Sequence, residues 1–276
     1  MEETYIERLF DVKEKVVVIT GGTGVLGTAI AAGLLQAGAS VVLLGTNKDK
    51  TQRAVDALRP LGGAVLGVQG NVLDEPSIRR VHADILERFH RVDVLINGAG
   101  GNLPGATIGL DQTVFDLQMD QFTQVMDLNL NGTVMPTLIF GKTMSEQKTG
   151  SIINISSMAA AQAITRVVGY SAAKAAIDNF TRWMAVEFAQ KFGSGIRVNA
   201  IAPGFLLTEQ NRALLTNEDG SLTQRGHTII DKTPFKRFGE PDELVGTILW
   251  LASDASRFVT GTVIPIDGGF SAFSGV

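Results

Sequence analysis

Short apolar runs alternate with longer segments of helical periodicity along most of the chain. The short runs hold five or six residues and are rich in valine, isoleucine and leucine, which is typical of strands buried on both faces of a parallel sheet. The longer segments gather their apolar residues on one helical face. The pattern predicts strands at 15–20, 40–44, 64–69, 92–96, 151–155, 196–201 and 262–266, and helices at 29–37, 48–60, 74–89, 121–147, 168–192 and 241–253.

Strands and helices that alternate at this spacing predict βαβ units with right-handed crossovers. We therefore expect one α/β domain over residues 1–276, built as a Rossmann-type, doubly wound parallel sheet of about seven strands with helices on both faces. A polar insert at 102–119 and a turn-rich stretch at about 205–237 have no clear period. Long irregular segments are typical of lids, binding loops or disorder, and we expect a substrate lid at about 205–237.

Composition narrows the classes of function. The net charge is −4 and only 19% of residues are charged, so no basic track favours nucleic acid as a partner. The chain has no cysteine, which excludes disulfides, thiolate catalysis and cysteine metal sites, and we expect no metal centre. The start lacks a signal-peptide pattern and no apolar run reaches membrane-spanning length. These features predict a soluble, cytoplasmic protein that is not bound to a membrane.

Glycines follow the first and fourth predicted strands. Gly21 to Gly27 reads GGTGVLG and leads into the helix at 29–37. Small residues let backbone approach a pyrophosphate, and a helix N-terminus offers free N–H groups and positive potential. The alternative is a tight turn that binds nothing. A second glycine-rich stretch, Asn97 to Gly101, ends the fourth strand, so both stretches are expected to border the crevice where such sheets bind ligands.

A tyrosine and a lysine stand four residues apart in the segment that follows the fifth strand. On a helix, Tyr170 and Lys174 share one face, and a nearby ammonium favours the phenolate, which lowers the pKa of the tyrosine. Tyr170 is therefore a candidate proton donor and acceptor, with Ser157 as a hydrogen-bonding neighbour. The alternative is an exposed tyrosine packed on the stem of the lysine.

Seven motifs together resemble the short-chain dehydrogenase/reductase family over about residues 11–270. They stand in the family's order: TGGTGVLG, NGAG, NLNG, INISS, YSAAK, VNAIAPG and VTGTVIPIDGG. The resemblance implies hydride transfer between a nicotinamide cofactor and a carbon that bears a hydroxyl or ketone. It implies that Tyr170 is the acid/base, Lys174 lowers its pKa and holds the nicotinamide ribose, Ser157 orients the substrate carbonyl, and Asn129 positions a water.

The resemblance also implies a set of cofactor-binding positions. They are Gly21, Thr23, Gly24, Val25, Leu26, Gly27, Thr46, Asn47, Asn71, Val72, Asn97, Gly98, Ala99, Gly100, Tyr170, Lys174, Pro203, Gly204, Phe205 and Thr208. Val25 replaces the middle glycine of the family's loop. Neither an acid at Gly45, typical of NAD enzymes, nor an arginine at Thr46, typical of NADP enzymes, is present. Both NAD and NADP stay open, with a slight preference for NAD because no basic pocket is visible.

Two stretches, 98–107 and 208–226, resemble the short-chain-type D-mannonate oxidoreductases, which interconvert D-fructuronate and D-mannonate. A sugar acid needs a cation for its carboxylate and hydrogen-bonding groups for its hydroxyls. The expected substrate-binding residues are Asn102, Ser157, Gln210, Asn211 and Arg212. Arg225, His227 and Lys232 are further candidates for the cation.

Other interpretations stay open. The chain could act on another sugar acid, polyol or ketone, as a gluconate 5-dehydrogenase does, or it could sense nicotinamide state without turnover. The resemblance implies a homotetramer, with the predicted helices at 121–147 and 168–192 as its interface. The apolar tail at 270–276 is hard to explain as exposed surface, so we expect it to pack on its own core or on a neighbouring subunit.

Overall fold

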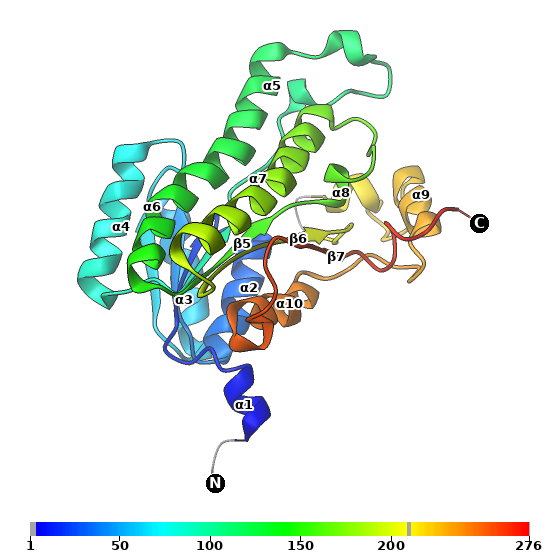
Figure 1. The fold of residues 1–276 in the computed structure, drawn as a ribbon. Coiled ribbons are helices and arrows are strands. Elements are labelled where there is room, and N and C mark those ends of the chain that lie inside the picture. The colour runs from blue at the N-terminus through cyan, green and yellow to red at the C-terminus, as the bar shows by residue number, and fades with distance from the viewer. Residues whose placement is uncertain (1–3, 209–210, 276) are drawn as a thin grey trace.

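Seven parallel strands form one sheet at the centre of the molecule (Figure 1). The computed structural model describes residues 4–208 and 211–275. The strands are β1 (Val16–Thr20), β2 (Ser40–Gly45), β3 (Val65–Gln69), β4 (Val94–Asn97), β5 (Gly150–Ile155), β6 (Ile196–Pro203) and β7 (Val263–Ile266). Their order is β3-β2-β1-β4-β5-β6-β7, and all neighbours run parallel. The predicted doubly wound sheet is confirmed, and each predicted strand lies within a few residues of the observed one.

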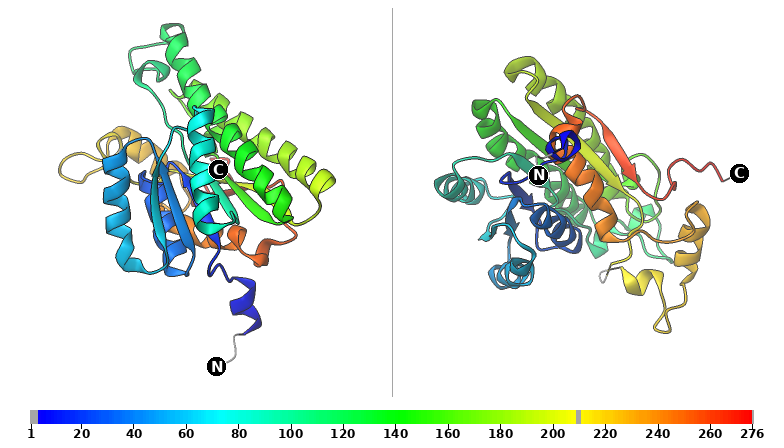
Figure 2. Two further views of the ribbon diagram at one scale, coloured as in Figure 1. Left: turned by 90° about the vertical axis from the view of Figure 1, so that its left-hand side faces the viewer. Right: turned by 90° about the horizontal axis from the view of Figure 1, so that it is seen from below.

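Helices cover both faces of the sheet, as Figure 2 shows. The α-helices are α1 (Tyr5–Leu9), α2 (Val25–Gln36), α3 (Lys48–Leu58), α4 (Glu75–Phe89), α5 (Met119–Met126), α6 (Gly132–Gln147), α7 (Val168–Phe192), α8 (Arg212–Leu215), α9 (Gln224–Lys232) and α10 (Val245–Ala252). One apolar core joins the sheet to α2, α3 and α10, and the other joins it to α4, α6 and α7. Because side chains alternate along a strand, Val17 and Ile19 enter the first core while Val16 and Val18 enter the second.

The helices differ from the sequence-based expectation at their ends and in the irregular segments. The helix expected at 29–37 begins at Val25, directly after the glycine turn. The helix expected at 121–147 is α5 and α6 joined by a π-helical turn at Asp127–Asn131. The segment at 205–237 contains α8 and α9, which its mixed composition did not predict. Within the described residues, every helix is too short or too polar to cross a bilayer.

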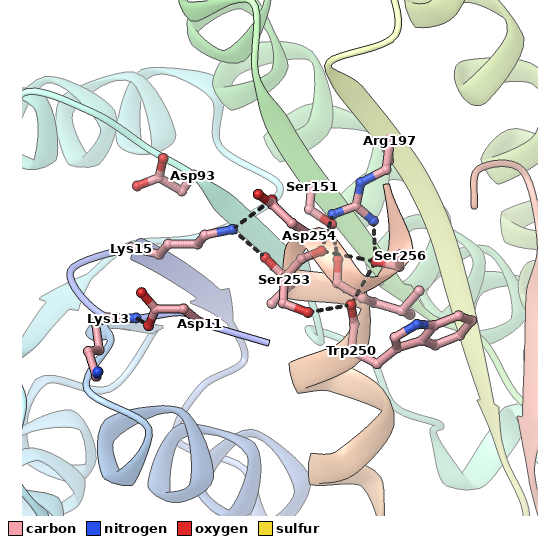
Figure 3. A network of polar contacts seen from close by, with 12 residues as sticks. Asp11, Lys13, Lys15, Asp93, Ser151, Arg197, Trp250, Ser253, Asp254 and Ser256 are labelled. Carbon is pink, nitrogen blue, oxygen red and sulfur yellow. Dashed lines mark hydrogen bonds and ion pairs between the residues drawn. The ribbon is translucent and has the colours of Figure 1, made fainter. Parts of the chain in front are cut away.

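A polar network ties the amino ends of the strands to the last helix (Figure 3). Arg197, on β6, donates to the hydroxyl of Ser256 at 2.7 Å and to the carbonyl of Ser253 at 3.1 Å. Lys15, just before β1, donates to the carbonyl of Ala252 at 3.0 Å, and Ser151 on β5 donates to that of Leu251 at 2.7 Å. These bonds satisfy carbonyls at the C-terminus of α10 that have no partner within the helix. They hold the amino ends of β1, β5 and β6, which lie at the end of the sheet opposite the glycine-rich turns.

Replacing Arg197 by alanine is expected to lower the free energy of unfolding by about 3 kcal/mol, because it deletes two charge-assisted hydrogen bonds of a buried group. Arg197 is only 8% exposed. Arg79→Ala is the matched control, since its ion pair with Glu75 is exposed and is expected to contribute at most about 0.5 kcal/mol. Urea denaturation measures both, and equal effects would contradict the assignment.

Candidate active site

The carboxyl ends of β1 and β4 approach so closely that only glycine fits between them. Gly21 has a φ of +64°, and a Cβ there would lie 2.8 Å from the carbonyl oxygen of Gly98. A Cβ on Gly27 would lie 2.7 Å from the carbonyl oxygen of Gly21. The hydroxyl of Thr20 accepts hydrogen bonds from the amides of Gly98 and Ala99, both at 3.1 Å. The two glycine-rich turns are therefore held together as one floor, at the strand ends where open α/β sheets bind ligands.

A cleft of about 510 Å³ opens above this floor. Most of the predicted cofactor positions line it: Gly21, Thr23, Gly24, Val25, Leu26, Gly27, Thr46, Asn71, Val72, Gly98, Ala99, Gly100, Tyr170, Pro203, Gly204, Phe205 and Thr208. Ser157 and Asn211, both predicted to bind substrate, line it as well. Sequence reasoning missed the residues that complete the wall: Leu44, Gly45, Lys50, Gly70, Leu128, Ile155, Ser156 and Leu206.

The cleft has the features that a dinucleotide requires. Helix α2 begins at its floor, and its N-cap, Gly24, provides no side-chain cap, so backbone N–H groups of the first turn point to the place where a pyrophosphate would lie. A Cβ on Gly45 would lie 2.8 Å from the hydroxyl of Thr51, so a side chain at that position would require Thr51 to move. The wall near this strand end carries Thr23, Thr46 and Lys50 instead.

Tyr170 and Ser157 meet at the rim of the cleft. Tyr170 lies in the first turn of α7, and Ser157 caps the 3₁₀ turn after β5, where its hydroxyl accepts from the amide of Ala159 at 3.2 Å. Burial raises the pKa of the Tyr170 phenol, and a side-chain hydrogen bond with Ser157 opposes that rise. Ser157 therefore caps the turn and also acts on the phenol of Tyr170.

Lys174 is buried directly behind the tyrosine. Its Nζ donates to the carbonyl of Ile155 at 2.7 Å and lies 5.4 Å from the centroid of the Tyr170 ring. Burial lowers the pKa of Lys174 to about 8, and Asp178 opposes the shift. The expectation that Lys174 lowers the pKa of Tyr170 is wrong for this structure, because the ammonium faces the ring and a backbone carbonyl, and burial of the phenol dominates.

Asn129 lies in the π-helical turn between α5 and α6 and is fully buried. Its amide nitrogen donates to the carbonyls of Gly101 at 2.7 Å and Val125 at 2.8 Å, and its amide oxygen accepts from the N–H of Gly101 at 3.3 Å. A Cβ on Gly100 would lie 2.6 Å from the Asn129 amide oxygen and 3.5 Å from the Lys174 Nζ. The side chain therefore fixes the second glycine turn beside Lys174, and its role in positioning a water stays a prediction.

Three predicted cofactor residues, Asn47, Asn97 and the buried Lys174, do not line the cleft. Asn97 is 2% exposed, and its amide donates to the hydroxyl of Thr137 at 2.9 Å and to the Asn154 amide oxygen at 2.8 Å. It thus links β4 and β5 to α6 beneath the floor. Asn47 accepts from the amide of Lys50 at 2.8 Å as the N-cap of α3, which is a local role typical of asparagine.

The predicted substrate residues separate in space. Asn211 accepts from the amide of Thr208 at 2.8 Å and donates to the carbonyl of Leu206 at 2.7 Å, so it shapes the loop above the cleft. Asn102 bonds to Thr107 at 2.7 Å and lies outside the cleft wall. Arg212 is exposed at the start of α8. Gln210 lies outside the residues that the structure describes.

The C-terminal segment reaches the site through one aromatic contact. Phe270 packs edge-to-face on Phe205 with ring centroids 5.2 Å apart, and the carbonyl of Ser271 accepts from Gln162 at 3.1 Å. The predicted packing of the tail is thus confirmed for its first two residues, whereas Phe273 is exposed and Val276 lies outside the described residues. Among those residues no cluster of three or more histidine, aspartate or glutamate side chains is placed to hold a metal ion.

Comparison with known proteins identifies the class. The family model described as enoyl-(acyl carrier protein) reductase matches residues 23–271, and the geometry above brings the family's motifs together at one cleft. The chain belongs to the short-chain dehydrogenase/reductase family of NAD(P)-dependent oxidoreductases. The predicted family is confirmed.

Particular relatives narrow the comparison. An uncharacterized oxidoreductase of Bacillus subtilis, UxuB, is 48% identical over 95% of this chain and 96% of its own length. A Haemophilus structure, provisionally named a D-mannonate oxidoreductase and solved with bound NAD, is 42% identical with a TM-score of 0.91, covering 98% of this chain and 100% of its own. An Agrobacterium tumefaciens structure, provisionally named a gluconate dehydrogenase, is 34% identical with a TM-score of 0.86, covering 96% and 98%.

Replacing Tyr170 by phenylalanine is expected to lower kcat by about 10²–10⁴-fold, because it removes the phenolic proton and leaves the ring in place. Binding of NAD(H) and the unfolding temperature are expected to stay at wild-type values. The chain has one other tyrosine, Tyr5, which is 61% exposed, so Tyr5→Phe is the matched control. Steady-state kinetics with any alcohol or ketone that the enzyme turns over give the measurement, and wild-type turnover by Tyr170→Phe would contradict the assignment.

Proposed function

We propose that this protein transfers a hydride between a nicotinamide cofactor and a sugar acid, and that it interconverts D-fructuronate and D-mannonate. The observation that carries the proposal is that Ser157 and Tyr170 line a cleft whose floor fits a dinucleotide, with Lys174 buried behind the ring of Tyr170. Similarity to a protein provisionally named a D-mannonate oxidoreductase supports the substrate. Similarity to a protein provisionally named a gluconate dehydrogenase supports the alternative, a gluconate 5-dehydrogenase or another polyol or ketone reductase.

In the proposed reaction Tyr170 moves the proton. When bound, the nicotinamide supplies or takes up the hydride. For reduction, the phenol of Tyr170 gives its proton to the carbonyl oxygen as the ketone becomes an alcohol, and for oxidation the phenolate takes that proton back. Ser157, whose hydroxyl opposes the rise in the pKa of the phenol, orients the substrate oxygen. Lys174 holds the nicotinamide ribose and keeps positive charge beside the phenol, and Asn129 keeps the second glycine turn in place next to it.

The proposed cofactor is NAD, with NADP as the alternative. Position 45 holds a glycine in place of the acid that would repel a 2′-phosphate. A Cβ at that position would lie 2.8 Å from the hydroxyl of Thr51, so an acidic side chain there would require Thr51 to move. Lys50 lines the same part of the cleft, so NADP is not disfavoured by charge. Bound NAD in the similar Haemophilus structure supports the preference for NAD.

A pair of arginines that lie outside the cleft wall supports an acidic substrate. Arg166 lies in the loop between Ser157 and Tyr170, and its Nε donates to the carbonyl of Ile108 at 2.7 Å. Arg225 lies in the first turn of the lid helix α9, where burial and the nearby Arg166 guanidinium lower its pKa. Among the described residues neither arginine pairs with a carboxylate. Two half-buried guanidinium groups of this kind suit a carboxylate ligand, which would relieve their repulsion.

A substrate screen tests the proposed function. Purified protein is assayed with D-mannonate, D-gluconate and neutral polyols in the presence of NAD or NADP, and with D-fructuronate in the presence of NADH or NADPH. We expect the highest kcat/KM for the D-mannonate and D-fructuronate pair with NAD(H). Turnover of gluconate or a polyol alone would favour the alternative substrate. Nicotinamide binding without any turnover would favour the non-catalytic sensor instead.

The same screen on Arg225→Gln tests the carboxylate site. We expect KM for D-mannonate to rise about 10–100-fold with a smaller change in kcat, because one charge-assisted hydrogen bond is lost. Turnover of neutral polyols, if present, should not change. Arg59→Gln, on the exposed surface, is the control, and equal KM values for the two variants would exclude Arg225 from substrate binding.

We also propose a homotetramer. Helices α6 and α7 expose Leu138, Trp183 and Val186, which are 58%, 61% and 56% accessible, and Leu138 also lines a groove of about 730 Å³ along α4 and α6. Exposed apolar surface on neighbouring helices supports an interface between subunits. We expect light scattering to give about four times the chain mass of 29.4 kDa, and Trp183→Glu to lower it. A monomer at micromolar concentration would contradict the proposal.

A further inference from the structure

One buried carboxylate beside the site has no part in the proposed reaction. Asp178 lies on α7, one helical turn after Lys174, and is 8% exposed. A buried acid is rare in proteins unless it is paired, because burial disfavours its charged form. The pKa of Asp178 is raised by burial, and its partners oppose that rise. A serine hydroxyl and two neighbouring cations stabilise the charged form of Asp178 against the effect of burial.

The serine is Ser156, which directly precedes Ser157. Its hydroxyl donates to the Asp178 Oδ1, and its amide donates to the carbonyl of Ile201 at 2.8 Å. Ser156 is 1% exposed, yet it forms part of the cleft wall. The hydrogen bond therefore joins α7 to the end of β5, one residue before the hydroxyl that contacts the phenol.

The cations that face Asp178 are Lys174 and Arg182, one turn before and one turn after it on α7. Arg182 is exposed to solvent, whereas Lys174 is 4% exposed. Arg197, on the adjacent strand β6, is bonded to Ser256 and Ser253 at the opposite end of the sheet. Asp178 is the only acid that acts on Lys174 among the described residues, so it is the counter-charge of the buried ammonium.

We propose that Asp178 is a positioning residue of the active site, which fixes the Ser156–Ser157 turn through a hydrogen bond and keeps Lys174 protonated through its charge. The inference rests on the proposed function of Lys174 and Tyr170. It assigns the two effects to two separable interactions of one carboxylate. The hydrogen bond helps to set where Ser157 meets the phenol, and the charge opposes the burial that lowers the pKa of Lys174.

The two contacts can be tested separately with three variants. Asp178→Asn removes the charge and keeps a hydrogen-bonding oxygen, Ser156→Ala removes the hydrogen bond and keeps the charge, and Asp178→Glu keeps the charge on a longer stem. Glu187→Gln, on the same helix, is the control for loss of one carboxylate. For each variant we would measure the pH dependence of NADH binding by fluorescence, the pH profile of kcat/KM, and the unfolding temperature.

Loss of the charge lowers the pKa of Lys174, because a carboxylate stabilises the ammonium form. We therefore expect Asp178→Asn to move the alkaline limb of both pH profiles by about one unit towards lower pH, and to weaken NADH binding several-fold near pH 8. Asp178→Glu should restore the limb. Ser156→Ala should leave the limb in place and lower kcat. A purely structural Asp178 would change the unfolding temperature and leave both pH profiles as in the wild type.

Wild-type pH profiles for a folded Asp178→Asn would overturn the proposal. If that variant does not fold, two other results would overturn the proposal. One is an alkaline limb that shifts in Ser156→Ala, and the other is an alkaline limb in Asp178→Glu that differs from the wild type. The NADH measurement needs no substrate, so failure to find a substrate would count against the proposed reaction and not against Asp178. Conversely, Tyr170→Phe that retains turnover would refute the proposed reaction whatever Asp178 does.

Discussion

The site depends on one buried ammonium group. A charged amine loses its hydration when it enters a protein interior and is stable there only with partners. Lys174 has a backbone carbonyl at the end of β5, a carboxylate one turn away on its own helix, and the face of an aromatic ring. The hydrogen bond to the Ile155 carbonyl fixes α7 against β5 at the point where Tyr170 reaches the cleft. The hydrogen bond that stabilises the buried ammonium therefore also positions Tyr170 at the cleft.

The sequence predicts much of this architecture because its main signals are local. Buried parallel strands are short β-branched runs, and glycine marks the turns where backbones meet, as Gly21 shows with its positive φ. Tyr170 and Lys174 are four residues apart on one helix, so their proximity follows from helical geometry alone. Ser157 follows from its spacing to Tyr170 within a familiar motif. The doubly wound sheet and the crevice then follow from the rules of βαβ topology.

What the sequence did not predict depends on tertiary contacts. Spacing places Lys174 near Tyr170, but it does not say that the ammonium faces the ring and a carbonyl, so the sign of the tyrosine pKa shift was wrong. Asn97 matches a cofactor motif, yet its amide is used in the core between β4, β5 and α6. Arg166 lies on a loop and Arg225 on α9, and no local sequence pattern connects them. The burial of a side chain, its orientation and the charges around it are set by tertiary contacts, so they are known only once the fold is known.

The π-helical turn at Asp127–Asn131 constrains how the chain can vary in length. Each residue advances an α-helix by about 100°, and a π turn holds one residue more than a regular turn. Deleting a residue here would restore a regular helix, but it would rotate α5 relative to α6 and take Asn129 away from Gly101. The irregular segment before α5 can absorb added residues without such a rotation. Length changes should therefore accumulate before this helix and be excluded from its middle.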